Sequence, residues 1–260
     1  MAIAMLQAHS PLWHYLWVAP NILFLMLGVL LWQRGLAKQF PAFFAFTILS
    51  PIGQLAVYVA DVVPTVTPQT FWRVDWASVL IVGVLKFAVI GEIFAQLLGS
   101  YSSLARLGKF LIRAVGAVMV LAATLAAAYA PKDSLFGIIR GAHLLEQTIY
   151  LIECGLFVFI FGLAYYFRLR FGRPVFGIAL GLSISACLNL AVWAVIANGG
   201  LPDQTRYLLD FVAMAAYHLC VLIWYYYLLV PQKAIVSAAI PLPENNLDVW
   251  NRELERLVHP

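Results

Sequence analysis

Seven apolar stretches, each long enough to cross a lipid bilayer, account for most of this 260-residue chain. A spanning helix needs about 20 consecutive, mainly apolar residues. Charged residues make up only 11% of the chain, whereas soluble domains are about a quarter charged. The stretches are Leu12 to Trp32, Ala42 to Ala60, Trp76 to Leu98, Phe110 to Ala130, Ile138 to Phe161, Val175 to Ala197 and Tyr207 to Val230. The sequence predicts an all-α integral membrane bundle of seven transmembrane helices over residues 1–230, followed by a tail over residues 231–260.

The Lys and Arg residues predict how the bundle is oriented. Most of them fall in the loops after the first, third and fifth stretches and in the tail, and the opposite side holds only Arg73, Lys132, Arg140 and Arg206. The positive-inside rule then places the N-terminus outside and the C-terminus in the cytoplasm, as expected in a bacterial cytoplasmic (inner) membrane. The net charge of +4 does not indicate nucleic-acid binding, because the basic residues lie at helix ends in contact with lipid headgroups and form no patch.

The tail contains one further helical pattern, from Asn245 to Leu257. Its apolar residues follow the 3, 4, 3 spacing of a single helix face, and they are Leu247, Trp250, Leu254 and Leu257. We expect a short cytoplasmic amphipathic helix at about 245–258. It would dock on the cytoplasmic ends of the bundle or, alternatively, bind a cytoplasmic protein partner.

Polar residues within the apolar stretches are the best candidates for a binding site. One stripe of the fifth stretch carries four of them at 3, 4, 3 spacing, and an ionised side chain facing lipid at mid-bilayer costs at least about 2.5 kcal/mol. The stripe should therefore face the bundle interior or a hydrated cavity. The candidates are His143, Glu146, Tyr150 and Glu153 on the fifth helix, Lys86 and Glu92 on the third, Asn189 on the sixth, and Asp210 and His218 on the seventh.

Two pairings within this set are expected. Lys86 should pair with Glu146 or Glu153, because each of these charges needs a partner inside the membrane. Glu92 and Glu153, if they are close, would share a proton or bind a cation. The alternative is a fully satisfied polar network that fixes the packing of the helices and binds no ligand.

Helix six and the three cysteines predict packing contacts. Gly177, Gly181 and Ser185, continued by Asn189, recur every four residues and form a face that another helix can approach closely, with Asn189 able to hydrogen-bond across it. Cys154, Cys187 and Cys220 fall within three different apolar stretches, where their spacing indicates small packing groups and neither a disulfide nor a zinc cluster.

The sequence requires no cofactor, and it contains no catalytic motif that would indicate an enzyme. His143 followed at i+3 by Glu146 offers two metal ligands from one helix face, but the second such element of carboxylate-bridged metal bundles is absent. Haem would need axial ligands from His14, His143 or His218, the histidines at membrane depth.

Four stretches resemble a family of bacterial seven-helix membrane proteins that has no established activity. They are FAVIGEIF (Phe87 to Phe94), LLEQTIYLIECGLFVFIF (Leu144 to Phe161), FGIALG (Phe176 to Gly181) and VWNRELERL (Val249 to Leu257). The layout is also similar to the seven-helix sensor region of bacterial histidine kinases, although no kinase follows the seventh stretch.

We therefore expect a sensory or receptor-like membrane module that binds a small ligand, an ion or a proton in a polar pocket between helices three, five and seven. One alternative is a proton-linked transporter or channel that uses Glu92, Glu146 and Glu153. Another is a non-catalytic membrane subunit of an oligomer or larger complex.

Overall fold

The computed structural model describes residues 9–98, 110, 114, 117, 135–166, 169, 171–197 and 202–230, and for residues 135–144, 203 and 204 the description is of the backbone. Every element within these ranges is an α-helix. The helices are α1 (Pro11–Gln33), α2 (Leu36–Gln39), α3 (Pro41–Val62), α4 (Pro68–Leu98), α6 (Leu135–Tyr166), α7 (Arg173–Ala197) and α8 (Asp203–Leu229). The chain divides into two units, Met1–Leu229 and Val230–Pro260, and the expected amphipathic helix lies outside the described residues.

Six of the described helices are long and apolar enough to cross a membrane, namely α1, α3, α4, α6, α7 and α8. They coincide with six of the seven apolar stretches. The remaining stretch, Phe110 to Ala130, lies outside the described residues apart from Phe110, Ala114 and Ala117. The protein is thus a helical integral membrane protein, and its seventh span stays a prediction.

The helices begin where local capping chemistry allows it. Ser10 precedes α1 and accepts the N–H of Trp13 at 3.3 Å through its hydroxyl. α4 starts before the apolar stretch at Trp76, because Thr67 accepts the N–H of Thr70 at 3.3 Å and Pro68 occupies the first turn. Pro20 and Pro51 lie inside α1 and α3, and both helices continue through them.

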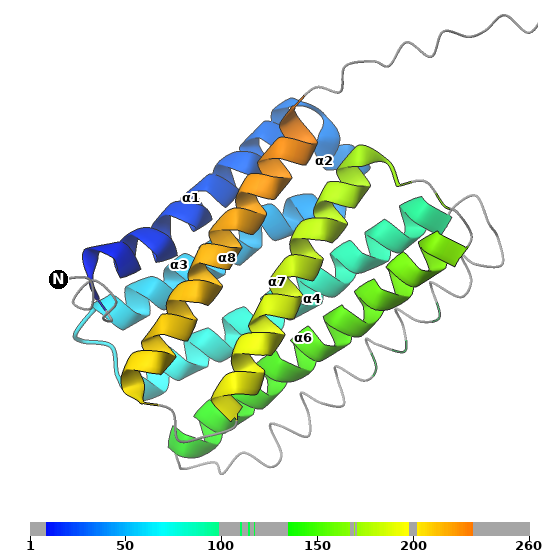
Figure 1. Cartoon of the computed structure of the whole chain (residues 1–260). Coiled ribbons are helices and arrows are strands. Elements are labelled where there is room, and N and C mark those ends of the chain that lie inside the picture. The colour runs from blue at the N-terminus through cyan, green and yellow to red at the C-terminus, as the bar shows by residue number, and fades with distance from the viewer. Residues whose placement is uncertain are drawn as a thin grey trace, which may run out of the picture. The chain divides into compact units, whose positions relative to one another are not determined.

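The six long helices pack in a closed ring (Figure 1). α1 contacts α3, α3 contacts α4, α4 contacts α6, α6 contacts α7, α7 contacts α8, and α8 returns to α1. α4 also contacts α7, which brings the third and sixth predicted spans together inside the ring. Side chains that point inward from α4, α6 and α7 therefore meet one another.

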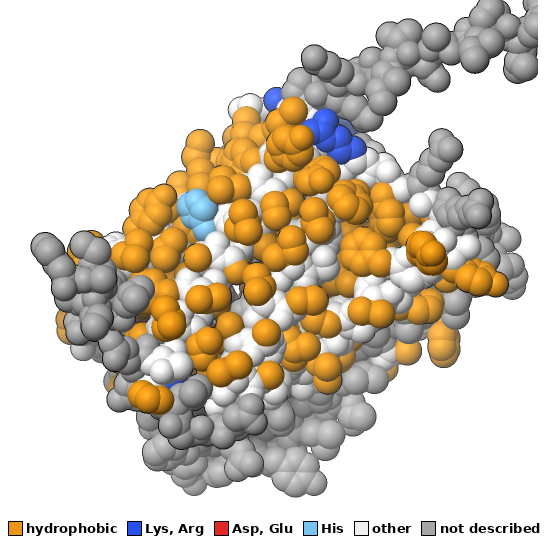
Figure 2. All heavy atoms as spheres, viewed as in Figure 1, with side chains coloured by type: hydrophobic (Ala, Val, Ile, Leu, Met, Phe, Trp, Pro, Cys, Tyr) orange, Lys and Arg blue, Asp and Glu red, His pale blue; other side chains and the backbone are white. Residues whose placement is uncertain are grey.

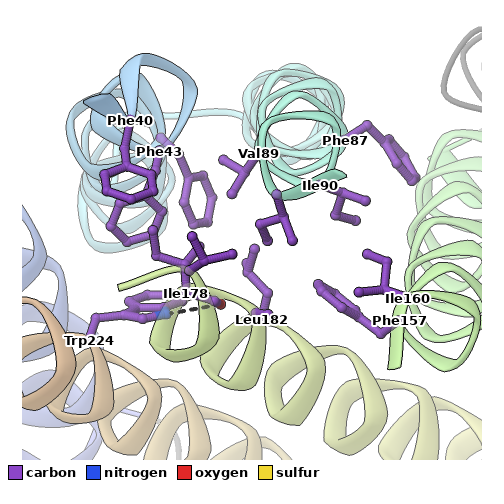
Figure 3. Close-up of a cluster of buried hydrophobic side chains, with 14 of the residues drawn as sticks. Phe40, Phe43, Phe87, Val89, Ile90, Phe157, Ile160, Ile178, Leu182 and Trp224 are labelled. Atoms are coloured by element: carbon purple, nitrogen blue, oxygen red, sulfur yellow. Dashed lines mark hydrogen bonds between the residues drawn. The ribbon is translucent and has the colours of Figure 1, made fainter. Parts of the chain in front are cut away.

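A cluster of large apolar side chains fills one part of the ring interior (Figure 3). Trp224 of α8 is buried there, and its indole N–H donates to the carbonyl of Ile178 on α7 at 3.4 Å. Its ring also stacks on Phe24 of α1, with the centroids 4.8 Å apart. Because lipid is as apolar as this core, dense packing of this kind has to hold the helices together.

The outer surface of the bundle is apolar. Figure 2 shows hydrophobic side chains spread over the face formed by α1, α8 and α7, while Lys and Arg side chains gather near the end of α8. Large residues such as Met26, Val84 and Val158 are more than half exposed. In a soluble protein such a surface would cause aggregation, whereas in a bilayer it contacts the acyl chains.

α7 is the sixth predicted span, and its predicted small-residue face packs against α8. A Cβ atom on Gly177 would collide with Tyr227, and one on Gly181 would collide with the Trp224 indole. Asn189 does not hydrogen-bond across this face, because its amide donates to the carbonyl of Ser185 in its own helix at 2.8 Å. The close approach therefore depends on the two glycines and involves no bond from Asn189 to α8.

Candidate functional site

A buried ion pair joins α4 to α6. Lys86 Nζ lies 3.1 Å from Glu153 Oε2, and the two residues are 7% and 0% exposed. The sequence predicted that Lys86 pairs with Glu146 or Glu153 of the fifth span, which is α6, and the structure shows that its partner is Glu153. A buried ion pair needs further hydrogen bonds to offset the cost of removing both charges from water.

Among the residues that the structure describes, the second carboxylate oxygen of Glu153 has no hydrogen-bond partner. Oε1 is buried and unsatisfied, although the other oxygen of the same group is bound to Lys86. Native proteins rarely leave such an atom unpaired, because its desolvation is not compensated. Glu153 Oε1 can therefore accept a hydrogen bond, a proton or a cation inside the bundle.

Tyr150 and Glu146 continue the polar contacts along α6. The Lys86 ammonium lies 4.6 Å from the centre of the Tyr150 ring, and the Tyr150 hydroxyl donates to Glu146 Oε1 at 3.0 Å. These two residues and Glu153 occupy one stripe of α6, as the 3, 4, 3 spacing predicted. The stripe faces Lys86 on α4.

Two further residues lie near Glu146. Asp75 of α4 lies within electrostatic range of Glu146, and the Trp193 side chain of α7 lies within hydrogen-bonding reach of it. Our sequence prediction missed both residues. Asp75 had a usable signal, since it precedes Lys86 by about three helical turns and so shares its face of α4, whereas Trp193 had none.

The contacts among Lys86, Glu146, Tyr150 and Glu153, together with Asp75, which lies within electrostatic range of Glu146, define the polar cluster of these five residues. It holds three carboxyl groups and one ammonium group. If all were ionised, two negative charges would be left uncompensated in an apolar environment, at a cost that proteins avoid by protonation or by cation binding. The composition of the cluster therefore favours the uptake of protons or of a small cation.

Glu92 is not part of the cluster. Its two carboxylate oxygens accept the backbone N–H groups of Ala42 and Phe43 at 3.1 Å each. These are free donors in the first turn of α3, where Pro41 contributes no N–H, and a negative charge is favourable at that helix end. The possible proton-sharing site of Glu92 with Glu153 is not formed, because the Glu92 carboxylate faces α3.

The candidates on α8 lie away from the cluster. Asp210 is exposed, and His218 lies beside Tyr15 of α1 with a ring distance of 6.1 Å. His218 Nδ1 is buried, and no described residue hydrogen-bonds to it. The described polar contacts of the cluster thus connect α4 and α6, the third and fifth predicted spans, as expected, and α7, the sixth span, takes the place expected for the seventh.

Among the described side chains, no group of three or more His, Cys, Asp or Glu residues is arranged to hold a metal ion. His14 Nδ1 lies 3.0 Å from the Tyr58 hydroxyl. His143 is on α6, but its side chain lies outside the described part of the chain.

A pair of cysteines lies next to the cluster. Cys154, which follows Glu153 on α6, has its Sγ 3.7 Å from the Sγ of Cys187 on α7, and both are free thiols. Sequence spacing did not predict this proximity, because the two residues belong to different helices. Only the register between α6 and α7 brings them together.

No protein-family model, curated protein or solved structure matches this chain.

Proposed function

We propose that this protein is a receptor-like module of the bacterial cytoplasmic membrane, and that its ligand is a proton or a small cation taken up by the polar cluster. The observation that carries the proposal is the state of Glu153, which is fully buried, bound to Lys86 through one oxygen and, within the described part of the chain, without a hydrogen-bond partner at the other. A carboxyl group inside the membrane is a candidate functional site, because placing an ionised group there has a high free-energy cost.

Ligand binding at Glu153 has a direct way to alter the helices. A proton or cation on Glu153 weakens its attraction to Lys86, and this ion pair joins α4 to α6. When that attraction is lost, the Lys86 ammonium can pair with Glu146, which lies within electrostatic range on the same face of α6. The exchange of one carboxylate partner for another amounts to a two-state element that a ligand can bias.

The predicted topology agrees with a receptor role. With the C-terminus in the cytoplasm, a movement of α6 or of its neighbours would be passed to the tail and to a protein that binds Leu247, Trp250, Leu254 and Leu257. The resemblance to the sensor region of bacterial histidine kinases points the same way.

Infrared difference spectroscopy on the protein in nanodiscs tests the proposal. We expect a carboxyl C=O band to appear when the pH is lowered or the sodium or potassium salt is removed, and to be lost in Glu153→Gln. Glu92→Gln is the matched control, because Glu92 is a helix cap outside the cluster. A spectrum that does not change with pH or salt would overturn the proposal and leave a packing network.

The second candidate is a proton-linked transporter, because a series of acids along helices can also form a conduction path. Sealed vesicles that contain the protein and a trapped pH indicator separate the two functions. A receptor should leave an imposed pH difference unchanged. Collapse of that difference, abolished by Glu153→Gln, would favour the transporter.

A further inference from the structure

We propose that Cys154 and Cys187 are a disulfide-forming site whose oxidant is a lipid-soluble quinone. This inference goes beyond the proposed function and does not rest on it. The two thiols come from adjacent helices, α6 and α7, and their sulfur atoms are 3.7 Å apart. A disulfide bond is about 2.05 Å long, so the two sulfur atoms have to move closer only by the difference between these two distances to form it.

The surroundings of the pair favour a disulfide over a bound soft metal ion. Both cysteines lie well inside candidate membrane spans, Leu145–Tyr166 and Arg173–Ile196. Two thiolates on a monovalent metal ion would leave a net negative charge in this apolar region, which is costly. Oxidation converts two neutral thiols into one neutral disulfide and creates no charge.

The position of Cys187 decides which oxidants have access. It is exposed on the surface of α7, while Cys154 is partly buried. Within a membrane span that surface faces acyl chains, so ionic oxidants dissolved in water are excluded from it. A membrane quinone, by contrast, dissolves in the same layer.

The reaction with a quinone is balanced without any further component. Two S–H bonds break and one S–S bond forms between Cys154 and Cys187. The two electrons and two protons pass to the two carbonyl oxygens of the quinone, which becomes a quinol. Ordinary protein dithiols are strong enough reductants for this direction of transfer.

Closure of the bond would connect α6 to α7 one residue away from Glu153. The oxidation state of the lipid quinone pool would then constrain the helix that carries most of the polar cluster.

The test uses the full-length protein in liposomes under anaerobic conditions, treated with duroquinone, whose ring is fully substituted and does not add to thiols. After denaturation, free thiols are counted by maleimide labelling and the intact mass is recorded. The chain has three cysteines, and we expect the quinone to leave only Cys220 labelled, with a loss of two hydrogen atoms. Glutathione disulfide, which stays in water, should leave all three thiols labelled.

Variants assign the bond to this pair. Cys220→Ala is the matched control and should still form the disulfide, whereas Cys154→Ser and Cys187→Ser should both abolish it. Unchanged labelling of the wild-type protein would overturn the site. Equal oxidation by glutathione disulfide would overturn the assignment of the oxidant to the lipid phase, and dependence on Cys220 would overturn the pairing.

Discussion

Glu92 on α4 accepts the backbone N–H of Phe43 on α3 at 3.1 Å, so a side chain 49 residues further along the chain serves as part of the cap of that helix. The other Glu92 oxygen accepts the N–H of Ala42. Gln96 donates its amide to the carbonyl of Gln39 at 2.9 Å, so Gln96 holds α4 to α2 while Glu92 holds it to the start of α3.

Replacing Glu92 should therefore loosen α3. Glu92→Ala leaves two N–H groups in the first turn without acceptors, and we expect a loss of about 1–2 kcal/mol in the free energy of unfolding. The measurement is an SDS-induced unfolding titration in mixed micelles. Gln96→Ala is the control and should cost less, since its bond is exposed. Equal stability of Glu92→Ala and the wild type would contradict the capping role.

The Lys86–Glu153 pair predicts a strongly non-additive double mutant. Lys86→Met alone leaves a buried carboxylate without its partner and should destabilise the protein by about 3 kcal/mol, whereas Lys86→Met combined with Glu153→Gln should recover most of that loss. The same SDS titration at neutral pH measures both variants. Lys38→Met, at an exposed position, is the control. Additive effects of the two substitutions would argue against a direct pair.

Gly181 should not tolerate even one methyl group. A Cβ atom there meets the indole of Trp224, a fully buried ring that cannot move aside, so Gly181→Ala should cost about 1–3 kcal/mol by overpacking. Gly155→Ala is a matched control within a membrane helix, because a Cβ atom on Gly155 meets nothing within 4 Å. Thermal unfolding in detergent compares the two. The prediction fails if the two variants melt at the same temperature.

The hydroxyl of Tyr225 ties α8 to α1. It donates to the carbonyl of Leu23 at 2.8 Å, and Tyr225→Phe removes that bond while keeping the ring. We expect a loss of about 0.5–1.5 kcal/mol in unfolding free energy, the usual worth of one such bond. Tyr226→Phe is the comparison, because Tyr226 is exposed and its contact with Arg173 involves the ring and the backbone carbonyl. An equal effect of both substitutions would show that the Leu23 bond contributes nothing specific.

The membrane helices could be predicted from the sequence because their cause is local. A segment that crosses lipid must satisfy its backbone hydrogen bonds internally, so apolar length is enough to identify a span. The stripe of Glu146, Tyr150 and Glu153 was predictable for the same reason, since helical spacing alone places the three residues on one face. That Lys86 needs an acidic partner also follows from the cost of an unpaired charge in the membrane.

The sequence was a poor guide to contacts between helices. The sequence allowed a site shared by Glu92 and Glu153, but Glu92 binds backbone N–H groups. Every residue except proline has such a group, so the sequence does not indicate which of them Glu92 binds. It expected Asp210 and His218 of the seventh span in the pocket, whereas the described polar contacts of the cluster come from α4, α6 and α7. It also treated Cys154 and Cys187 as separate packing groups.

The sequence by itself determined that this is a helical membrane protein with acids and a lysine inside the bilayer, because hydrophobicity and helical periodicity act over a few turns of one segment. Only the tertiary structure decided that Lys86 pairs with Glu153, that Glu92 caps α3, and that two cysteines meet between α6 and α7. Each of these contacts depends on the register and rotation of one helix against another. Those are set by close packing at positions such as Gly181, where van der Waals fit replaces the hydrophobic effect.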